Sequence, residues 1–405
     1  MTTFQPSRSH ALACMKNFVP LMGQSYTSRR NYDLGTGNHN FVSQLSPYVR
    51  RRLITEQELV QAASQAHGLE GAEKFIQEVF WRSYFKGWLE RRPGIWNSYV
   101  QGVHEDLEEV NSDPNMEARL ARAESGETGI TCFDAWANEL TETGYLHNHS
   151  RMWFASIWIF TLHLPWRLGA DFFYRHLLDG DPASNTLGWR WVAGLHTRGK
   201  PYEAKAWNIA KFTNNKFTPP EGEIASDIQS LDALEPEGLP ALQPLRKPLV
   251  PNRELPSALL ITEEDCHIET FLPEMLNICS SRSLVSSLLR SPRPVADHVR
   301  LFEAKALSDT ASRLKVDATQ MECLDPMILA SWAKEAGAKQ IVTAYVPEGP
   351  LRDWLRKAEP ALQEAQIPLC EWQRDWDANI WPSATAGFFK VKQKIPSILS
   401  SLEIF

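Results

Sequence analysis

The sequence predicts a mainly α-helical N-terminal part followed by a smaller C-terminal α/β part that contains a parallel sheet. Three observations lead to this fold class. Apolar residues recur at helical spacing before residue 218, short apolar runs alternate with helical stretches after residue 256, and a proline-rich segment separates the two regions. A chain of 405 residues is also too long for one compact core. We therefore expect domains at 1–218 and 257–405, joined by a linker at 219–256.

The N-terminal part contains clear amphipathic stripes. One of them places apolar residues at positions i, i+3, i+4, i+7 and i+8, which is the spacing of one face of a helix: Ala72, Phe75, Ile76, Val79 and Phe80. A second stripe has the same character: Phe133, Trp136, Ala137 and Leu140. The longest apolar stretch, 152–166, is interrupted by polar residues and falls short of the roughly 20 residues that cross a membrane. We expect it to form a buried helix and expect no membrane association.

The linker and the C-terminal part have different patterns. Eight prolines between Thr218 and Pro256, without a sustained apolar period, indicate an extended linker with one short helix at most. Beyond it, βα units on a parallel sheet are expected. The predicted strands are Ala258–Thr262, Val299–Phe302, Gln340–Val346 and Pro368–Trp372, and the predicted helices include Pro326–Ala338 and Gly349–Gln366.

Charge and cysteine content restrict the function classes. The net charge is −7, with the acidic excess beyond residue 220. Six cysteines occur without any C-x-x-C pair, which argues against zinc ribbons, iron–sulfur clusters and a disulfide framework. The N-terminus shows no cationic segment followed by an apolar core, so we expect a cytoplasmic protein.

A basic cluster at Arg50, Arg51 and Arg52 allows two interpretations. It could bind a polyanion, because phosphate attraction depends on the local field rather than on net charge. It could also be one solvated face of a helix. On these three residues alone, the solvated face is the favoured interpretation.

Familiar metal and nucleotide motifs are not matched. The run from Asp179 to Arg190 begins like a calcium loop, but Ser184 replaces the turn glycine and Arg190 replaces the bidentate glutamate. His147 and His149 lie two residues apart and would point to different sides of a helix. No metal site is predicted. Neither G-x-G-x-x-G after a strand nor G-x-x-x-x-G-K-[ST] is present, so a dinucleotide would be held without a glycine-rich loop.

An ordered series of motifs between residues 43 and 191 resembles the DNA photolyase/cryptochrome family. Ser43–Tyr48 is similar to the family's S-x-LSPY segment, and Glu78–Phe85 to its E-x-x-WR-x-[FY]-[FY] helix. Thr128–Gly129, Asp134–Ala135 and Thr143–Met152 resemble TG…DA…TGW-h-HN-x-x-RM. The series continues through a segment that resembles DGD…N…GW-x-W, with Asp179, Asp181, Asn185, Trp189 and Trp191.

The resemblance implies a bent FAD inside the helical domain. Its implied cofactor contacts divide into a diphosphate group, with Tyr32, Ser43, Leu45 and Ser46, and a flavin and ribose group, with Asn148, Arg151, Asp179, Asp181 and Asn185. By resemblance, Asn185 faces flavin N5, where a neutral amide can donate or accept as the redox state changes. Arg151 and Asp179 are expected to form an ion pair.

The same resemblance implies a lesion pocket and a light-driven reaction. Its walls would be Glu78, Trp81, Met152 and Trp191, with Arg82 meeting a phosphate. Flat apolar walls and one acid suit a flipped pyrimidine dimer. The expected activity is deoxyribodipyrimidine photo-lyase, a carbon–carbon lyase that repairs UV-damaged single- or double-stranded DNA. Glu78, Asn185, Trp189 and Trp166 are the expected catalytic group; the last two match the inner members of an electron-transfer tryptophan chain.

Some features depart from the family pattern. Ala123 stands where the outer tryptophan of the chain is expected, so photoreduction would either use a different outer residue, such as Trp153 or Trp158, or be slow. Ala206–Ile209 replaces R-x-FNP, and the segment from Asp375 to Val391 resembles the close of the photolyase α/β domain, which implies an exchanged domain order. An antenna chromophore and the oligomeric state cannot be inferred. A cryptochrome-like blue-light photoreceptor without repair activity is the alternative function.

Overall fold

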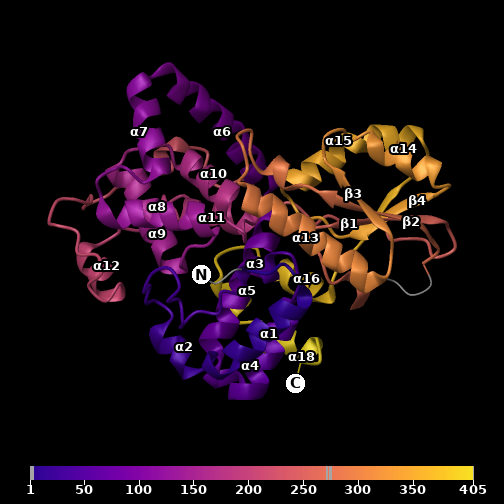
Figure 1. The fold of residues 1–405 in the computed structure, drawn as a ribbon, viewed down its shortest axis with the longest axis horizontal. Coiled ribbons are helices and arrows are strands. Elements are labelled where there is room, and N and C mark those ends of the chain that lie inside the picture. Colours follow the sequence, from indigo (N-terminus) through magenta and orange to yellow (C-terminus); the bar gives the residue numbers. More distant parts are fainter. Residues whose placement is uncertain (1–3, 271, 273–275, 405) are drawn as a thin grey trace.

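The computed structural model describes residues 4–270, 272 and 276–404. The described chain up to residue 212 is built of helices and their connections, as expected (Figure 1). Its α-helices are α1 (Arg8–Phe18), α2 (Gln24–Arg29), α3 (Ser46–Arg50), α4 (Glu56–Gly71), α5 (Glu73–Glu90), α6 (Pro93–Ser112), α7 (Pro114–Ser125), α8 (Thr131–Thr143), α9 (Asn148–Ser156), α10 (Trp166–His176), α11 (Pro182–Val192) and α12 (Ala206–Phe212).

Several helix starts follow directly from the local sequence. Thr55 and Glu58 form a capping box, in which the Thr55 side chain accepts from the Glu58 amide and the Glu58 carboxylate accepts from the Thr55 amide. Asp181 caps α11 by accepting from the Ser184 amide, and Pro182 occupies the first turn, where a missing N–H costs nothing. The expected buried helix over 152–166 is only partly correct, because α9 changes to a π-helical turn at Ile157–Thr161 and α10 starts at Trp166.

The C-terminal part forms a five-stranded parallel sheet with the order β3-β2-β1-β4-β5. Its elements are β1 (Ser257–Thr262), β2 (Ile278–Val285), α13 (Asp297–Leu314), β3 (Ala318–Glu322), α14 (Ile328–Glu335), β4 (Gln340–Ala344), α15 (Pro350–Glu364) and β5 (Leu369–Trp372), followed by α16 (Asp375–Ile380), α17 (Phe389–Lys392) and α18 (Ile395–Ser401). The strand predicted at Val299–Phe302 is wrong, because these residues belong to α13. Val299 and Phe302 are three residues apart and both buried on one helix face.

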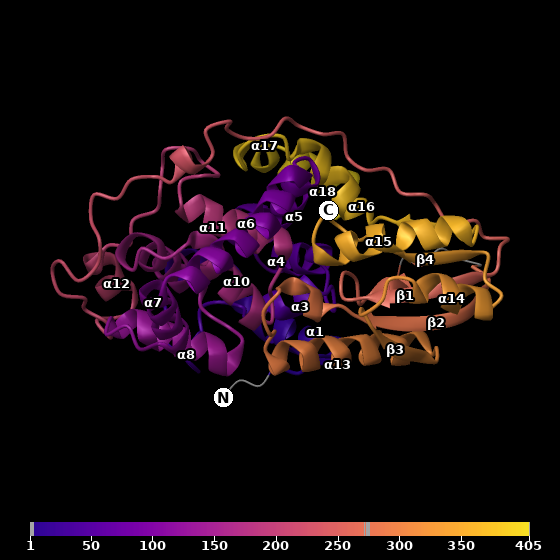
Figure 2. The same ribbon diagram turned by 90° about the horizontal axis from the view of Figure 1, so that it is seen from above.

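The central strand β1 shows how the sheet is covered. Ala258 and Leu260 pack in a core with α14 and α15, whereas Leu259 and Ile261 join a core shared with α13 and the helical part. This alternation follows from the two-residue period of a strand. Figure 2 shows α15 and α13 on opposite sides of the strands. One face of the sheet therefore belongs to the same hydrophobic core as the helical part.

The chain returns to the helical part after the sheet. Between residue 213 and residue 256 the structure has neither an α-helix nor a strand, and this segment runs along one edge of the molecule towards the sheet (Figure 2). After β5, the helices α16 and α17 pack against α5. Gly87 of α5 allows a close approach of the chain at Trp381, since a Cβ there would lie 2.9 Å from the Trp381 Cα.

Both interpretations of the basic cluster at Arg50, Arg51 and Arg52 are wrong. All three side chains are buried, so they form neither a solvated helix face nor a surface for a polyanion. Their partners are carboxylates that follow β1 and a carboxylate of α16: Glu263, Glu264, Asp265 and Asp377. These acidic residues lie more than 200 positions away, so the local sequence gave no sign of the pairing. The cluster joins the helical part to the α/β part.

Candidate cofactor and substrate site

A cavity of about 610 Å³ opens between α5, α9 and α11, within the size range of small-molecule and cofactor sites. Most of the residues predicted from the sequence line it: Ser43, Leu45, Ser46, Glu78, Trp81, Arg82, Asn148, Arg151, Met152, Asp179, Asp181, Asn185, Trp189 and Trp191. Tyr32 and Trp166 are not among the lining residues. The Tyr32 ring packs 5.2 Å from the Phe212 ring, and the Trp166 ring lies 6.1 Å from the Tyr99 ring.

The inner end of the cavity is polar. The predicted ion pair is present, with Arg151 Nη2 2.8 Å from Asp179 Oδ2, and Arg151 Nε also donates to the Leu146 carbonyl. Asn185 Nδ2 donates to the Ala170 carbonyl at 2.7 Å. This bond fixes the orientation of the Asn185 amide, so the side chain is held in place by α10.

Asp181 is a second carboxylate at this end, and it has three cationic side chains around it. Its side chain is buried, and burial alone would raise its pKa. Arg82, Lys86 and Arg50, which lie 3.4 to 3.9 Å away, nevertheless hold the pKa of Asp181 well below its ordinary value. Asp181 is therefore ionised at neutral pH, and it links the cavity to the buried charge cluster.

The mouth of the cavity is formed by α5. Glu78, Trp81 and Phe85 follow one another at helical spacing on the face that lines the cavity. Partial desolvation raises the pKa of Glu78, while Arg30 at 3.7 Å and Lys74 act in the opposite direction. Trp81 stacks on Phe388 with ring centroids 4.0 Å apart and an interplanar angle of 16°. One face of Trp81 is thus covered by the C-terminal part of the chain.

The predicted phosphate ligand Arg82 is engaged with protein groups. Its Nε lies 3.2 Å from Glu56, its Nη1 lies 3.4 Å from Asp181, and its Nη2 donates to the Arg50 carbonyl at 3.1 Å. Lys86, one turn further along α5, is also buried and pairs with Glu264 at 3.3 Å. Both cations therefore tie the cavity wall to the charge cluster.

Two pairs of tryptophan rings lie at or near the cavity, Trp189 with Trp158 and Trp153 with Trp136. Trp189 lines the cavity, and its ring lies 6.2 Å from the Trp158 ring. Trp158 is fully buried and donates from Nε1 to the Pro165 carbonyl, directly before Trp166. Trp153 instead stacks on Trp136. Trp158 therefore contacts Trp189 directly, whereas the Trp153 ring contacts a different tryptophan.

Further residues that were not predicted as site residues also line the cavity, among them two tyrosines, an arginine and a histidine. Tyr26, Arg30, Tyr145 and His149 come from α2, the segment after it, the turn after α8, and α9. Tyr145 and His149 lie inside the quoted motif series, so the sequence did contain a signal for them. Tyr26 and Arg30 come from a region outside the quoted motifs and gave no such signal.

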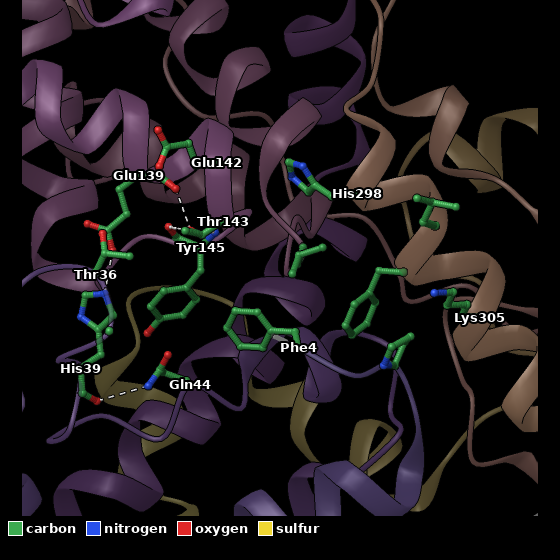
Figure 3. A pocket seen from close by; sticks show the side chains of 15 residues that line it. Phe4, Thr36, His39, Gln44, Glu139, Glu142, Thr143, Tyr145, His298 and Lys305 are labelled. Carbon is green, nitrogen blue, oxygen red and sulfur yellow. Dashed lines mark hydrogen bonds and ion pairs between the residues drawn. The ribbon is translucent and has the colours of Figure 1, made fainter. Parts of the chain in front are cut away.

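A second, smaller cavity of about 280 Å³ adjoins the first and shares Gln44 and Tyr145 with it. Figure 3 shows Glu139, Glu142 and His39 on one side of it, Phe4 and Tyr145 in the centre, and His298 and Lys305 on the other side. His39 pairs here with Glu139 at 2.7 Å and with Asp33 at 3.5 Å. The two cavities thus meet at Gln44 and Tyr145, and a buried polar cluster that includes His39 and Glu139 lies beside the smaller one.

The donor and acceptor set of the larger cavity fits a flavin dinucleotide. Asp179 Oδ1 and Trp189 Nε1 are buried and have no hydrogen-bond partner within the described chain. The serine hydroxyls at positions 43 and 46 can donate to phosphate, and the carboxylates can accept from ribose hydroxyls and ring N–H groups. Charged acceptors, neutral amides and hydroxyl donors thus occur together in one cavity, as such a cofactor requires.

Comparison with known proteins agrees with this geometry. Residues 75–223 match the family described as the FAD-binding domain of DNA photolyase. A deoxyribodipyrimidine photo-lyase of Synechococcus is 31% identical over 204 residues, which cover 49% of this chain and 40% of the relative. One from Streptomyces griseus is 36% identical over 160 residues, covering 39% and 33%.

A solved structure of a Synechocystis cryptochrome is 23% identical, covers 52% of this chain and 44% of its own, and has a TM-score of 0.41. The chain spans two fifths or less of the length of the two photo-lyases above. No helix among the described residues is long and apolar enough to cross a membrane. Residues 75–223 thus resemble the FAD-binding domain of DNA photolyase, and most of this match lies in the N-terminal, helical part.

Proposed function

We propose that this protein is a light-driven DNA repair enzyme, a deoxyribodipyrimidine photo-lyase that splits cyclobutane pyrimidine dimers. The observation that supports this most strongly is the composition of one cavity. The acid, the aromatic walls and the methionine of the expected lesion pocket line the same 610 Å³ space as the expected flavin residues: Glu78, Trp81, Met152 and Trp191 with Asn148, Arg151, Asp179, Asp181 and Asn185. Cofactor and substrate would therefore be in contact.

The inner end of the cavity would hold the cofactor. Asp179 and Asp181 accept hydrogen bonds from its ring and ribose, and Ser43 and Ser46 donate to its phosphates. The bond from Asn185 to the Ala170 carbonyl holds the amide in one orientation, with its oxygen and second N–H left for the flavin. When bound and reduced, the flavin supplies an electron on excitation by blue light and takes it back after the dimer has split.

The mouth would hold the flipped dimer. Trp81 and Trp191 offer flat apolar surfaces for stacking, and Met152 fills the space between wall and base. Glu78 lies beside these walls, where its carboxyl group can form hydrogen bonds with the polar edge of a pyrimidine. Binding in this position removes water from the dimer and orients it towards the flavin.

A cryptochrome-like photoreceptor without repair activity is the second candidate. Two observations favour it. Arg82, the expected phosphate ligand, is engaged by Glu56, Asp181 and a backbone carbonyl, and one face of Trp81 is covered by Phe388. A receptor of this type would keep the flavin residues and lack a working lesion pocket.

Illumination with dimer-containing DNA separates the two functions. Purified protein with reduced FAD bound is mixed with single- or double-stranded oligonucleotides that carry one cyclobutane dimer, and dimer loss is followed by chromatography. We expect light-dependent loss of the dimer. If the flavin is reduced and bound but no dimer disappears, the enzyme proposal is wrong and the photoreceptor remains. A purified protein that takes up no flavin, seen by its absorption spectrum, would remove both candidates.

The expected domain division and location also remain proposals. We infer that residues 219–256 link units at 1–218 and 257–405. Limited proteolysis should cut the linker first, and the buried charge cluster should keep both fragments together in gel filtration. Fragments that separate would contradict the role of the cluster. A cytoplasmic location is tested by cell fractionation.

A further inference from the structure

The segment Gly387–Lys394 lies along the edge of the cavity-lining helix α5. Ala386, directly before it, accepts a hydrogen bond from the Tyr84 hydroxyl at 2.8 Å, and Phe388 stacks on Trp81. Lys392 pairs with Glu73, at the start of α5, at 3.4 Å. The contacts therefore follow α5 from residue 84 back to residue 73, a length of about 16 Å at the rise of an α-helix. Figure 2 shows α17 beside α5.

The preceding residues hold this segment firmly. Arg92 donates to the Thr385 carbonyl at 2.9 Å, and Trp376 donates to the Ser83 hydroxyl at 2.8 Å. Trp381 is buried and packs closely on Gly87. Within the segment itself, Phe388 and Val391 are buried. The backbone of the segment is thus fixed relative to the mouth of the cavity.

The residues between these anchors face solvent. Phe389 is 66% exposed, although it follows the residue that stacks on Trp81. Lys390 and Lys394 are exposed as well. The segment contains three lysines and no acidic residue in a chain with a net charge of −7. An exposed aromatic ring among cations, beside a cavity for a base, is the arrangement that single-stranded nucleic acids bind.

We propose that Gly387–Lys394 binds the single DNA strand that carries the base in the cavity, with Phe389 stacking on a neighbouring unpaired base and Lys390 and Lys394 contacting phosphates. The inference deepens the proposed function and rests on it for the identity of the strand. Stacking on a free ring needs an unpaired base, which is why a single strand is favoured over an intact duplex. The phosphate contacts follow from charge complementarity.

The test uses undamaged DNA in the dark, so it does not depend on repair. Binding of the full-length, flavin-loaded protein to a fluorescent 12-nucleotide single strand is measured by anisotropy. Phe389→Ala should weaken binding by roughly 5- to 100-fold, and Phe389→Trp should restore it. Leu324, 77% exposed in the loop after β3, provides the control: Leu324→Ala should leave binding unchanged.

The lysines give an independent readout. The slope of log affinity against log salt should fall by roughly 1.4 in the double variant Lys390→Gln/Lys394→Gln, since each phosphate contact contributes about 0.7 for a single strand. The matched control is Lys334→Gln/Lys339→Gln, whose lysines are exposed on the α/β part.

Three outcomes would overturn the proposal. Unchanged binding of Phe389→Ala would show that the ring makes no contact with DNA. Equal loss for duplex and single strand would exclude base stacking. A Phe389-dependent change in sedimentation would show that the ring serves self-association. If instead single-strand binding depends on Phe389 but illumination removes no dimer, the proposed enzyme activity fails while this surface stands.

Discussion

Two hydrogen bonds at the inner end of the cavity join residues close in sequence, whereas contacts at its mouth join residues about 300 positions apart. The Arg151–Asp179 and Asn185–Ala170 hydrogen bonds join residues 28 and 15 positions apart. At the mouth, the Tyr84 hydroxyl bonds a carbonyl 302 positions away, and Trp81 stacks on Phe388. These two inner-end bonds are therefore a property of the motif series, whereas the mouth, like the ion pairs of Asp181, depends on the assembled chain.

This difference predicts how variants will behave. Changes at the inner end should remove the cofactor, and they should also destabilise the fold where they reach the buried charges. Changes at the mouth should affect substrate binding with the flavin still bound. The four predictions below test this division, from the largest expected effect to the smallest.

The largest effect is expected for Asp181. Its removal leaves Arg82, Lys86 and Arg50 with less compensation in a buried site, which typically costs about 3–5 kcal/mol. Asp181→Ala should therefore lower the free energy of unfolding by about this amount and abolish flavin binding. Urea denaturation and flavin absorbance measure both.

A matched control for Asp181→Ala is Asp113→Ala. Asp113 also caps a helix, by accepting from the Asn115 amide, but it is not buried in the charge cluster. Its loss should cost about 1 kcal/mol, the usual value of a cap. Equal destabilisation by the two variants would mean that Asp181 acts as a cap alone.

The second prediction concerns acid pH. Burial would raise the pKa of Glu56, but Arg52 and Arg82 lower it from 4.5 to about 2. Burial would likewise raise the pKa of Glu263, but Arg50 and Arg290 lower it from 4.5 to about 2. Carboxyls with a depressed folded pKa stabilise the protein above the unfolded value, and this stabilisation is lost as pH falls from about 4.5 towards 2.

The free energy of unfolding should therefore fall steeply below pH 4.5. Asp377 and Glu303 have raised pKa values, so their protonation at acid pH favours the folded state. They therefore reduce the steepness with which the free energy of unfolding falls with pH. Urea denaturation at pH 7, 4.5 and 3 measures the effect. Glu263→Gln should make the free energy of unfolding depend less on pH. An unchanged pH dependence in that variant would contradict the lowered pKa of Glu263.

The sequence predicts those parts of the structure that local patterns define, and it misses those that depend on distant contacts. β1, β4 and β5 were predicted because their residues are mostly apolar and almost all buried. β2 and β3 were missed, because their sequences, ICSSRSLV and ATQME, are half exposed and largely polar. Their strand conformation depends on pairing in the sheet, which a local pattern does not record.

The site shows a similar limit. The residues of α9 and α11 were predicted, since the motif series places them at fixed spacing. The partners of Arg50, Arg51 and Arg52 were not, because an ion pair between residues 213 positions apart has no local signature. The cover of Trp81 by Phe388 was missed for the same reason. The roles of the individual site residues remain predictions.

The third prediction is made for Trp81. Trp81→Ala should weaken binding of dimer-containing DNA by about 1–3 kcal/mol, the usual value of one base–aromatic stack, while flavin stays bound. Trp81→Phe should retain most of the affinity, because a flat ring remains on Phe388. Binding is measured by anisotropy and flavin by absorbance. Loss of flavin in Trp81→Ala would show that the residue belongs to the core.

The smallest effect on stability is expected for Gly188, which lines the cavity on α11. An added Cβ there meets no atom within 4 Å, so Gly188→Ala should leave the fold intact and stabilise the helix by up to about 1 kcal/mol. The methyl group would occupy cavity space, and flavin affinity should fall. Gly87→Ala is the opposite case, because its Cβ would lie 2.8 Å from Trp381 Cγ, and overpacking of this kind costs about 1–3 kcal/mol.

The pair thus separates cofactor binding from packing. Urea denaturation of the flavin-free protein should show Gly188→Ala at or above the wild-type stability and Gly87→Ala below it. Flavin titration should rank the two in the reverse order. A Gly188→Ala protein that is destabilised but binds flavin normally would mean that α11 at this position packs against protein, and the inner end of the cavity would then be smaller than the flavin requires.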